Sequence, residues 1–206
     1  MKAYYDARAP EYDEWYLGLG RFEEIERPDW DRAVRELGRV ISELPAARTL
    51  DVACGTGFLT RHLRGELAAL DQSERMLAIA RRRVPHAELV QGDALALPFA
   101  ADSFERVFTG HFYGHLQRKQ RARFLAQARR VAPELVVLDA ALRADRGPEE
   151  WQQRVLNDGS RYEVYKRYFD PHALVEELGG GTVLHSDTWF VMVSSPRSDA
   201  DGGHGR

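Results

Sequence analysis

Short apolar runs alternate with longer amphipathic segments through most of this chain. The runs cover residues 48–53, 67–70, 87–91, 105–109 and 135–139, and each has the length of one strand. Apolar residues recur at helical spacing over residues 29–44, 73–84 and 117–131, and a helix is also expected from the loop after residue 53 to about Arg64. Strands that alternate with helices pair in parallel through right-handed crossovers. The pattern therefore predicts an α/β fold, a doubly wound sheet with helices on both faces.

The alternation weakens after residue 139. Residues 148–156 predict a helix, residues 161–169 are aromatic, basic and ambiguous, and residues 171–178 predict a helix that ends at three glycines. Residues 182–186 and 189–194 predict a hairpin. With no repeat or linker in between, residues 1–195 are expected to form a single domain. Residues 196–206, rich in Ser, Asp and Gly, are expected to be a disordered tail.

The first 27 residues are unusually aromatic. Four tyrosines and one tryptophan fall between residues 4 and 16. Aromatic side chains with polar tips suit a partly buried lid over a pocket. A helix packed on the edge of the domain explains them equally well, and the two interpretations are compatible.

Composition narrows the class of protein. The chain has 206 residues, a formal charge of −3 and a single cysteine. The charge argues against nucleic acid bound by bulk charge, and one cysteine fits a reducing compartment. No apolar run approaches the ~20 residues that cross a bilayer. We expect a cytoplasmic monomer or homodimer without a nucleic-acid, membrane or metal partner, in which the basic segment 117–131 is a charged outer helix face.

The loop after the first strand contains small residues at Ala53, Gly55 and Gly57. Such a loop lets a ligand approach the backbone, and the helix start behind it attracts a polar or anionic group. A phosphate-binding P-loop would need Gly-Lys-Ser/Thr at its end, where Phe58 follows Gly57. A dinucleotide fingerprint would need a third glycine where Thr60 stands. A nucleoside without phosphates fits best.

Three aspartates stand at the ends of three consecutive predicted strands. They are Asp51, Asp71 and Asp93, and doubly wound sheets bind ligands at this edge. Asp71 can accept hydrogen bonds from both hydroxyls of a ribose, as the equivalent carboxylate does in dinucleotide folds. Asp93 can accept from the amine of adenine, and the N–H of Ala94 can donate to the ring. Taken singly, each aspartate is commonly a cap or turn residue; the ordered set favours ligand binding.

These motifs resemble the class I S-adenosylmethionine (SAM)-dependent methyltransferases, with small-molecule members as the nearest match. The resemblance lies in DVACGTG at 51–57, LDQSERML at 70–77 and GDALALPF at 92–99, and extends over residues 1–195 because the aromatic N-terminus is similar to the family's cap. It implies a Rossmann-like seven-stranded sheet with an antiparallel last strand and an N-terminal helical cap. The implied cofactor is SAM, with S-adenosylhomocysteine (SAH) as its product.

The resemblance also implies roles for individual residues. Ala53, Gly55 and Gly57 would lie against the methionine part of the cofactor, and Ala53 departs from the glycine that many members carry. Asp71 would hold the ribose and Asp93 and Ala94 the adenine. The remaining implied contacts are Gln72 and Met76 beside the adenosine, Thr109 and Gly110 at the reacting end, and Tyr12 closing over the cofactor.

The methyl acceptor depends on residues 110–115, a loop that the family places beside the transferable methyl group. His111 is the first candidate for a base and Tyr113 for a substrate contact, whereas His115 is expected to be structural. A positioned base contributes ~10²–10⁴-fold when the acceptor carries a proton. The alternative is that His111 is a polar wall residue that never takes a proton. The loop lacks the Asn/Asp-Pro-Pro-Tyr/Phe signature of planar-nitrogen methyltransferases, which favours an oxygen, carboxylate or aliphatic amine acceptor.

Residues 161–169 interleave cations with aromatic side chains. They could bind an acidic or aromatic acceptor, or Lys166 and Arg167 could cover a solvated edge strand, which we prefer; at least one tyrosine is expected in a pocket. The predicted function is methyl transfer from SAM to a small molecule, with oxygen slightly preferred to nitrogen or carbon. The alternatives are a nicotinamide-dependent oxidoreductase and a cofactor-binding module without catalysis.

Overall fold

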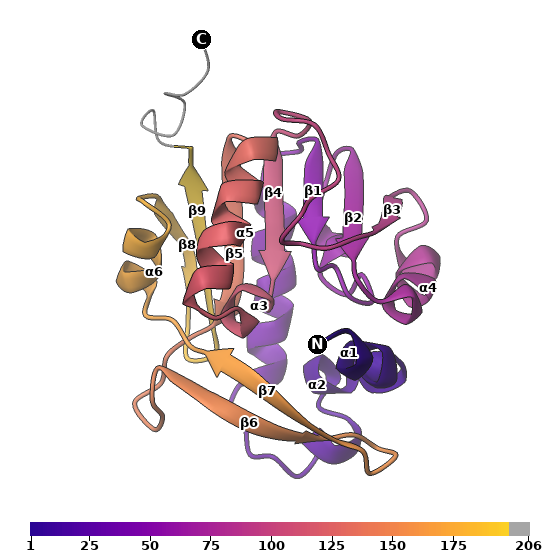
Figure 1. Cartoon of the computed structure of the whole chain (residues 1–206). Coiled ribbons are helices and arrows are strands. Elements are labelled where there is room, and N and C mark those ends of the chain that lie inside the picture. Colours follow the sequence, from indigo (N-terminus) through magenta and orange to yellow (C-terminus); the bar gives the residue numbers. More distant parts are fainter. Residues whose placement is uncertain (198–206) are drawn as a thin grey trace.

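The computed structural model describes residues 1–197, and its centre is a seven-stranded sheet (Figure 1). The strand order is β3-β2-β1-β4-β5-β9-β8, in which β1 to β5 are parallel and β9 is antiparallel to both neighbours. The expected fold class is therefore confirmed. The strands are β1 (Thr49–Val52), β2 (Leu67–Asp71), β3 (Glu88–Gln91), β4 (Arg106–Gly110), β5 (Glu134–Ala140), β8 (Thr182–Ser186) and β9 (Phe190–Pro196).

Helices cover both faces of this sheet because neighbouring strand residues point to opposite sides. On β4, Val107 packs in the cluster with Phe124 of α5 (Arg118–Val131), whereas Phe108 packs in the other cluster with Leu37 of α3 (Trp30–Glu43). The first cluster also includes Leu174 of α6 (Pro171–Glu177). Helix α4 (Glu74–Arg83) begins at Ser73, whose side chain accepts a hydrogen bond from Met76 N as an N-cap.

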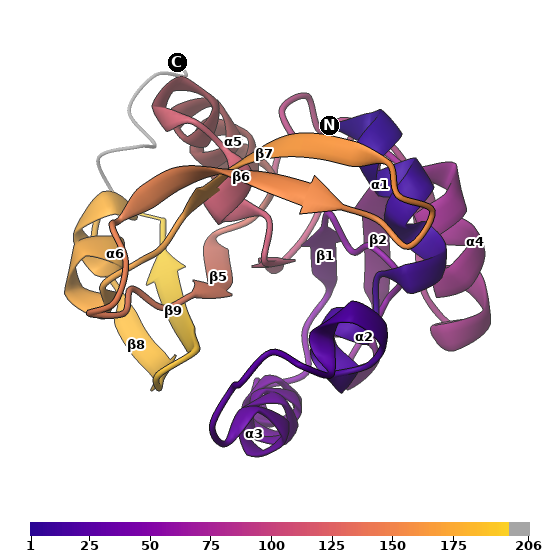
Figure 2. The same cartoon turned by 90° about the horizontal axis from the view of Figure 1, so that it is seen from below.

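Two further units lie at the carboxyl edge of the parallel strands (Figures 1 and 2). One is the N-terminal cap, α1 (Lys2–Arg8) and α2 (Glu14–Leu17) joined by a 3-10 turn at Ala9–Glu11. The other is an antiparallel hairpin of β6 (Glu149–Val155) and β7 (Arg161–Arg167), separate from the main sheet. Tyr4 joins the two, since it packs in one apolar cluster with Leu156 and Val164.

Two expected helices are wrong. The helix expected over residues 148–156 is replaced by the strand β6 (Glu149–Val155), because pairing with β7 and packing against the cap outweigh the helix propensity of its Glu and Gln side chains. After the glycine loop, the structure has only the 3-10 turn Thr60–His62, which Leu63 ends in an extended conformation. The expected disordered tail lies outside the described residues except for Pro196, which ends β9, and Arg197. No helix in the described chain is both long and apolar enough to cross a membrane.

Candidate active site

The loop after β1 turns sharply at three left-handed residues. The φ angles are 60° at Ala53, 55° at Gly55 and 75° at Gly57. Glycine adopts this conformation without strain, whereas alanine does so rarely. A Cβ atom on Gly55 would stand 3.5 Å from the ring of Tyr12, in ordinary contact with it, so the cap packs directly over this loop.

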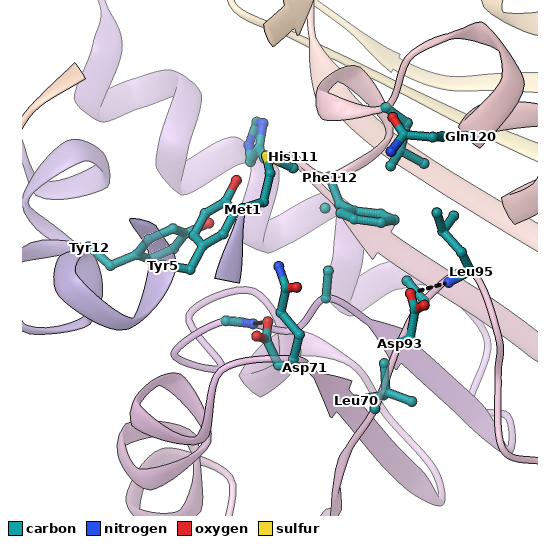
Figure 3. A pocket seen from close by; sticks show the side chains of 17 residues that line it. Met1, Tyr5, Tyr12, Leu70, Asp71, Asp93, Leu95, His111, Phe112 and Gln120 are labelled. Carbon is teal, nitrogen blue, oxygen red and sulfur yellow. Dashed lines mark hydrogen bonds between the residues drawn. The ribbon is translucent and has the colours of Figure 1, made fainter. Parts of the chain in front are cut away.

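A cavity of about 250 Å³ opens beside this loop, between the strand ends and the N-terminal cap (Figure 3). Asp71 and Asp93 face it from one side, and Tyr5, Tyr12 and His111 from the other. Among the described residues that line it, only Asp71 and Asp93 have charged side chains, and we call it the acidic cavity. Its lining includes eight of the predicted cofactor residues: Tyr12, Ala53, Gly55, Asp71, Gln72, Asp93, Ala94 and Gly110.

The Asp71 carboxylate is held rigidly at the end of β2. Its Oδ1 accepts a hydrogen bond from Ser73 N at 2.8 Å, and its Oδ2 accepts one from Gly55 N at 2.9 Å. Burial raises the pKa of Asp71 despite these backbone donors. A carboxylate has about four acceptor positions, so each oxygen can accept a further bond from a ligand. This arrangement suits two neighbouring hydroxyl groups.

Asp93 stands on the other side of the same cavity, after β3. Its Oδ1 accepts a hydrogen bond from Leu95 N at 2.8 Å, which fixes the turn that presents Ala94. Phe112 and Leu95 also line this end of the cavity. A flat ligand at this end would find the Asp93 carboxylate as a hydrogen-bond acceptor at its edge and apolar side chains beside it. This environment suits a purine ring.

Four of the predicted cofactor residues do not line this cavity. Asp51 accepts a hydrogen bond from Thr60 Oγ1 at 2.6 Å, and burial raises its pKa to about 7. It borders a separate space of about 10 Å³ beneath the loop. Thr109 Oγ1 donates to Val52 O, Gly57 packs against α4, and Met76 is buried. None of these four residues lines the acidic cavity, and they lie behind the residues that do.

The sequence prediction omitted several lining residues. Two of them could have been predicted from the sequence, because Tyr5 lies in the aromatic N-terminal segment and Phe112 in the loop after β4. Met1, Leu116 and Gln120 could not, since only the folded chain brings them to the cavity.

A second cavity of about 290 Å³ adjoins the first, between the cap and the β6–β7 hairpin. Tyr5, Tyr12 and His111 line both, so these three side chains form the shared wall. The described part of the chain contributes one carboxylate to its lining, that of Glu26, and we call it the basic cavity. The cations that line it are Arg8, Arg27, Arg143, Arg146, Arg154 and Lys166.

His111 occupies the shared wall in an unusual conformation. Its φ angle is 57°, and its N–H donates to Leu138 O at 2.8 Å. The ring packs edge-on against Trp15 and Phe190, and its buried Nε2 has no hydrogen-bond partner among the described residues. Burial lowers the pKa of His111 to about 4. The imidazole is therefore neutral at pH 7 and is a weak base.

The structure places Tyr113 in the core instead of beside a substrate. Its side chain is fully buried, stacks on Phe169 and donates its hydroxyl proton to Glu177 Oε1 at 2.9 Å. Tyr113 lines neither cavity, because the turn after β4 directs it away from the shared wall. His115 lines the basic cavity, with Nδ1 2.8 Å from Tyr165 O, and burial lowers its pKa to about 3.

Lys166 differs from the expected solvated cation. It is buried, and its Nζ donates to Asp139 Oδ1 at 2.5 Å. Arg167 is partly exposed and pairs with Glu149 and Glu177. Of the tyrosines in residues 161–169, Tyr168 lines the basic cavity. The expected pocket tyrosine is thus present. The expected outer helix face on α5 is also incomplete, because Arg121 is buried and pairs with Glu177.

Comparison with known protein families gives a match to the methyltransferase domain over residues 49–134. The chain is 46% identical over 79 residues to 2-phytyl-1,4-naphtoquinone methyltransferase of Thermosynechococcus vestitus, covering 34% of this chain and 35% of that protein. It is 36% identical over 118 residues to demethylmenaquinone methyltransferase of Thermotoga maritima, covering 53% and 49%. The chain thus spans between about a third and a half of the length of these two curated relatives.

Solved structures are similar over more than nine-tenths of the chain. The DhpI-SAM-HEP complex superposes with a TM-score of 0.74 at 27% identity, covering 93% of this chain and 94% of that one. Magnesium protoporphyrin IX methyltransferase (ChlM) from Synechocystis PCC 6803 with bound SAH gives a TM-score of 0.63 over 96% and 98%; at 14% identity it shows the fold alone. The domain match and these likenesses confirm the resemblance that the three sequence motifs carry.

Proposed function

We propose that this chain, a class I SAM-dependent methyltransferase by its matched domain and its fold, transfers a methyl group from SAM to a small molecule. One observation carries the proposal: an acidic and a basic cavity meet at a wall of three side chains, Tyr5, Tyr12 and His111. Two ligands that occupy the two cavities would bring their reacting atoms together at this wall. Methyl transfer needs that alignment more than any other contribution from the protein.

The acidic cavity fits SAM. Asp71 would bind the ribose hydroxyls through the acceptor capacity that the backbone leaves unused, and Asp93 with Ala94 would bind the adenine. Ala53, Gly55 and Gly110 leave room for the methionine part, with Gln72 beside the adenosine. The predicted residues beneath the cavity, Asp51, Gly57, Met76 and Thr109, would support these contacts indirectly. When bound, SAM supplies an electrophilic methyl group on a positively charged sulfur.

The residues of the shared wall would align the acceptor and exclude water. Tyr5 and Tyr12 come from the cap, and His111 from the end of β4. His111 was predicted as a base, but a group with a pKa of about 4 accepts a proton from an alcohol poorly. It is better suited to orienting the acceptor through Nε2. We prefer an oxygen acceptor; nitrogen and carbon acceptors are the alternative.

Calorimetric titration with SAM, SAH and NAD tests the cofactor. We expect SAM and SAH to bind with one site per chain and NAD to give no heat. Incubation with methyl-labelled SAM and small-molecule extracts should then yield a labelled product heavier by one CH₂ unit, detected by mass spectrometry. Binding of NAD alone would favour the oxidoreductase, and SAM binding without any labelled product would favour the non-catalytic module.

The remaining expectations stay proposals. A charge of −3 and one cysteine, Cys54, support a cytoplasmic protein that acts on small molecules without nucleic acid or membrane. Burial raises the pKa of Cys54 well above its ordinary value, so its thiol is unreactive. A monomer or homodimer is proposed, and light scattering coupled to gel filtration would measure which one forms.

A further inference from the structure

The basic cavity contains more positive charge than the protein itself neutralises. Lys166 is balanced by Asp139 at 2.5 Å, and Arg143 is paired with the exposed Asp145 at 2.6 Å. Arg146 lies 3.8 Å or more from its nearest carboxylates, and its Nη1 donates to the hydroxyl of Tyr168. Within the described residues, the other three cations, Arg8, Arg27 and Arg154, form no ion pair.

Arg154 is the clearest of these three. It extends from β6, its Nη2 donates to Gln152 Oε1, and its buried Nε has no hydrogen-bond partner. Burial lowers the pKa of Arg154, since no carboxylate compensates for the lost hydration. A partly buried cation whose buried Nε donor is unsatisfied is costly for a folded protein. An anion in the cavity that accepts a hydrogen bond from the guanidinium would offset this cost.

Arg8 brings the same charge to the shared wall. Its Nη1 donates to the Tyr4 hydroxyl at 2.8 Å, and its guanidinium lies 4.9 Å from the ring centre of Tyr12, which borders both cavities. Arg8 and Lys166 are also near enough to His111 to disfavour its protonation. An anion held by Arg8 and Arg154 would therefore lie beside the shared wall, where the methyl group would be transferred.

The same cavity offers little that could remove a proton. Its one lining carboxylate is Glu26, and His111 is a weak base. A hydroxyl or ammonium acceptor must lose a proton during the reaction, whereas an ionised acid has none to lose. A protonated amine would in addition be repelled by the arginines. Charge and acid–base chemistry thus favour the same class of acceptor.

We propose that the acceptor is a small acid whose ionised oxygen, in a carboxylate, phosphonate or phosphate group, is bound by Arg8 and Arg154 and receives the methyl group. The proposal rests on the methyltransferase function proposed above. In the reaction, an oxygen–carbon bond forms and the sulfur–carbon bond breaks, and the bonding electrons remain on sulfur. The products are a methyl ester and a neutral thioether, and no proton is released. Trp15, Trp30 and Trp189 line the cavity, so the acid carries an apolar or aromatic body.

Calorimetry on the full chain saturated with SAH tests this proposal. The probes are benzoate and phenylphosphonate, with benzyl alcohol and benzylamine as neutral and cationic counterparts of similar size. We expect the two acids to bind and the alcohol and amine to bind at least tenfold more weakly. Arg154→Gln and Arg8→Gln should each weaken acid binding by about tenfold or more, because each removes a charge-assisted hydrogen bond.

Arg82→Gln is the matched control, since Arg82 is an exposed arginine on α4 that lines neither cavity. It should leave acid binding unchanged, and all three variants should remain folded and keep their SAH affinity to within a few-fold. Equal binding of acid and alcohol, or unchanged acid binding in Arg154→Gln, would overturn the acid proposal alone. Failure of the unsubstituted protein to bind SAH would instead overturn the methyltransferase proposal and the acceptor with it.

Discussion

The acidic and basic cavities share one wall but are built in different ways. The acidic cavity uses Asp71, the last residue of β2, and Asp93, which follows β3, and backbone N–H groups fix both carboxylates. The basic cavity takes its cations from outside the parallel strands, with Arg8 and Arg27 from the N-terminal region and Arg154 and Lys166 from the hairpin. The sheet edge thus provides one ligand site, and the added elements provide a second site of opposite charge.

This difference has a consequence for the two ligands. A positively charged sulfur is stabilised near carboxylates, and an anionic acceptor is stabilised near arginines. The positive sulfur and the anionic acceptor would then meet at the wall between the cavities, and transfer of the methyl group would neutralise both charges. Because the cations of the basic cavity come from elements outside the sheet, changes in these elements would alter the acceptor, which allows one fold to serve many acceptors.

The largest expected effect is on stability and concerns Lys166, the cation of the basic cavity that is paired with a buried carboxylate. Lys166→Met should lower the free energy of unfolding by about 3–5 kcal/mol, because it leaves the buried Asp139 without its partner. Urea denaturation at pH 7 measures this loss. Arg39→Met, which removes a cation from an exposed ion-paired helix surface, should leave the denaturation midpoint almost unchanged.

The pH dependence of Lys166→Met provides a second check. Burial opposes ionisation of Asp139, yet Lys166 and His111 outweigh it and lower the pKa of this carboxyl. A carboxyl whose pKa is lowered by folding stabilises the folded state at pH values above its pKa in the unfolded chain, which is near 4. This contribution is lost as the pH falls. The deficit of the variant should therefore shrink on acidification, once Asp139 is protonated. A deficit that grows toward pH 4 would contradict the structural role of this pair.

The next effect concerns the acidic cavity. Asp71→Asn should weaken SAM binding by about tenfold to a hundredfold, since the amide keeps one acceptor oxygen and loses the charge. Calorimetry measures the change, and a thermal melt establishes that the loop after β1 still folds. Glu88→Gln, which neutralises an exposed carboxylate on β3 outside the cavity lining, should bind SAM normally. Unchanged affinity in Asp71→Asn would refute the ribose role.

A smaller effect of opposite sign is expected in the basic cavity. Arg154→Met should raise the free energy of unfolding of the ligand-free protein by about 1 kcal/mol, because it removes a partly buried cation that has no carboxylate partner among the described residues. For a chain of this size, this raises the melting temperature by about 2–4 °C. A loss of stability in Arg154→Met would mean that Arg154, like Lys166, is part of the folding core.

The two cavities also differ in how far the sequence predicts them. Asp71 and Asp93 follow strands with clear apolar runs, so their shared edge is predictable from local patterns and strand order. Residues 149–155 have no such pattern, since polar side chains occupy both faces of β6. Their strand depends on pairing with β7 and on contacts with Tyr4, about 150 residues away in the chain. The basic cavity could therefore not be assembled from local signals.

Lys166 and Tyr113 show the same limit at single positions. Lys166 was interpreted from its immediate neighbours as a solvated cation, and Tyr113 was interpreted as a substrate contact because the family resemblance places its loop beside the methyl group. Their actual surroundings depend on partners distant in the chain, Asp139 for Lys166 and Glu177 for Tyr113. Residue type and local spacing predict which chemistry is available, and tertiary contacts determine where it is used.

The smallest expected effect concerns His111, where the two cavities meet. His111→Asn keeps a hydrogen-bonding side chain and a residue that tolerates a positive φ angle. If His111 only orients an ionised acceptor, turnover should fall by about fivefold or less, the value of one hydrogen bond, with SAM affinity unchanged. The loss of a general base would instead cost ~10²–10⁴-fold. The pH profile adds a second readout: with a pKa of about 4 for His111, turnover of the unsubstituted enzyme on an acid probe should be flat between pH 6 and 8. A rise in turnover through pH 6–7 that disappears in His111→Asn would restore His111 as a base and favour an acceptor that carries a proton.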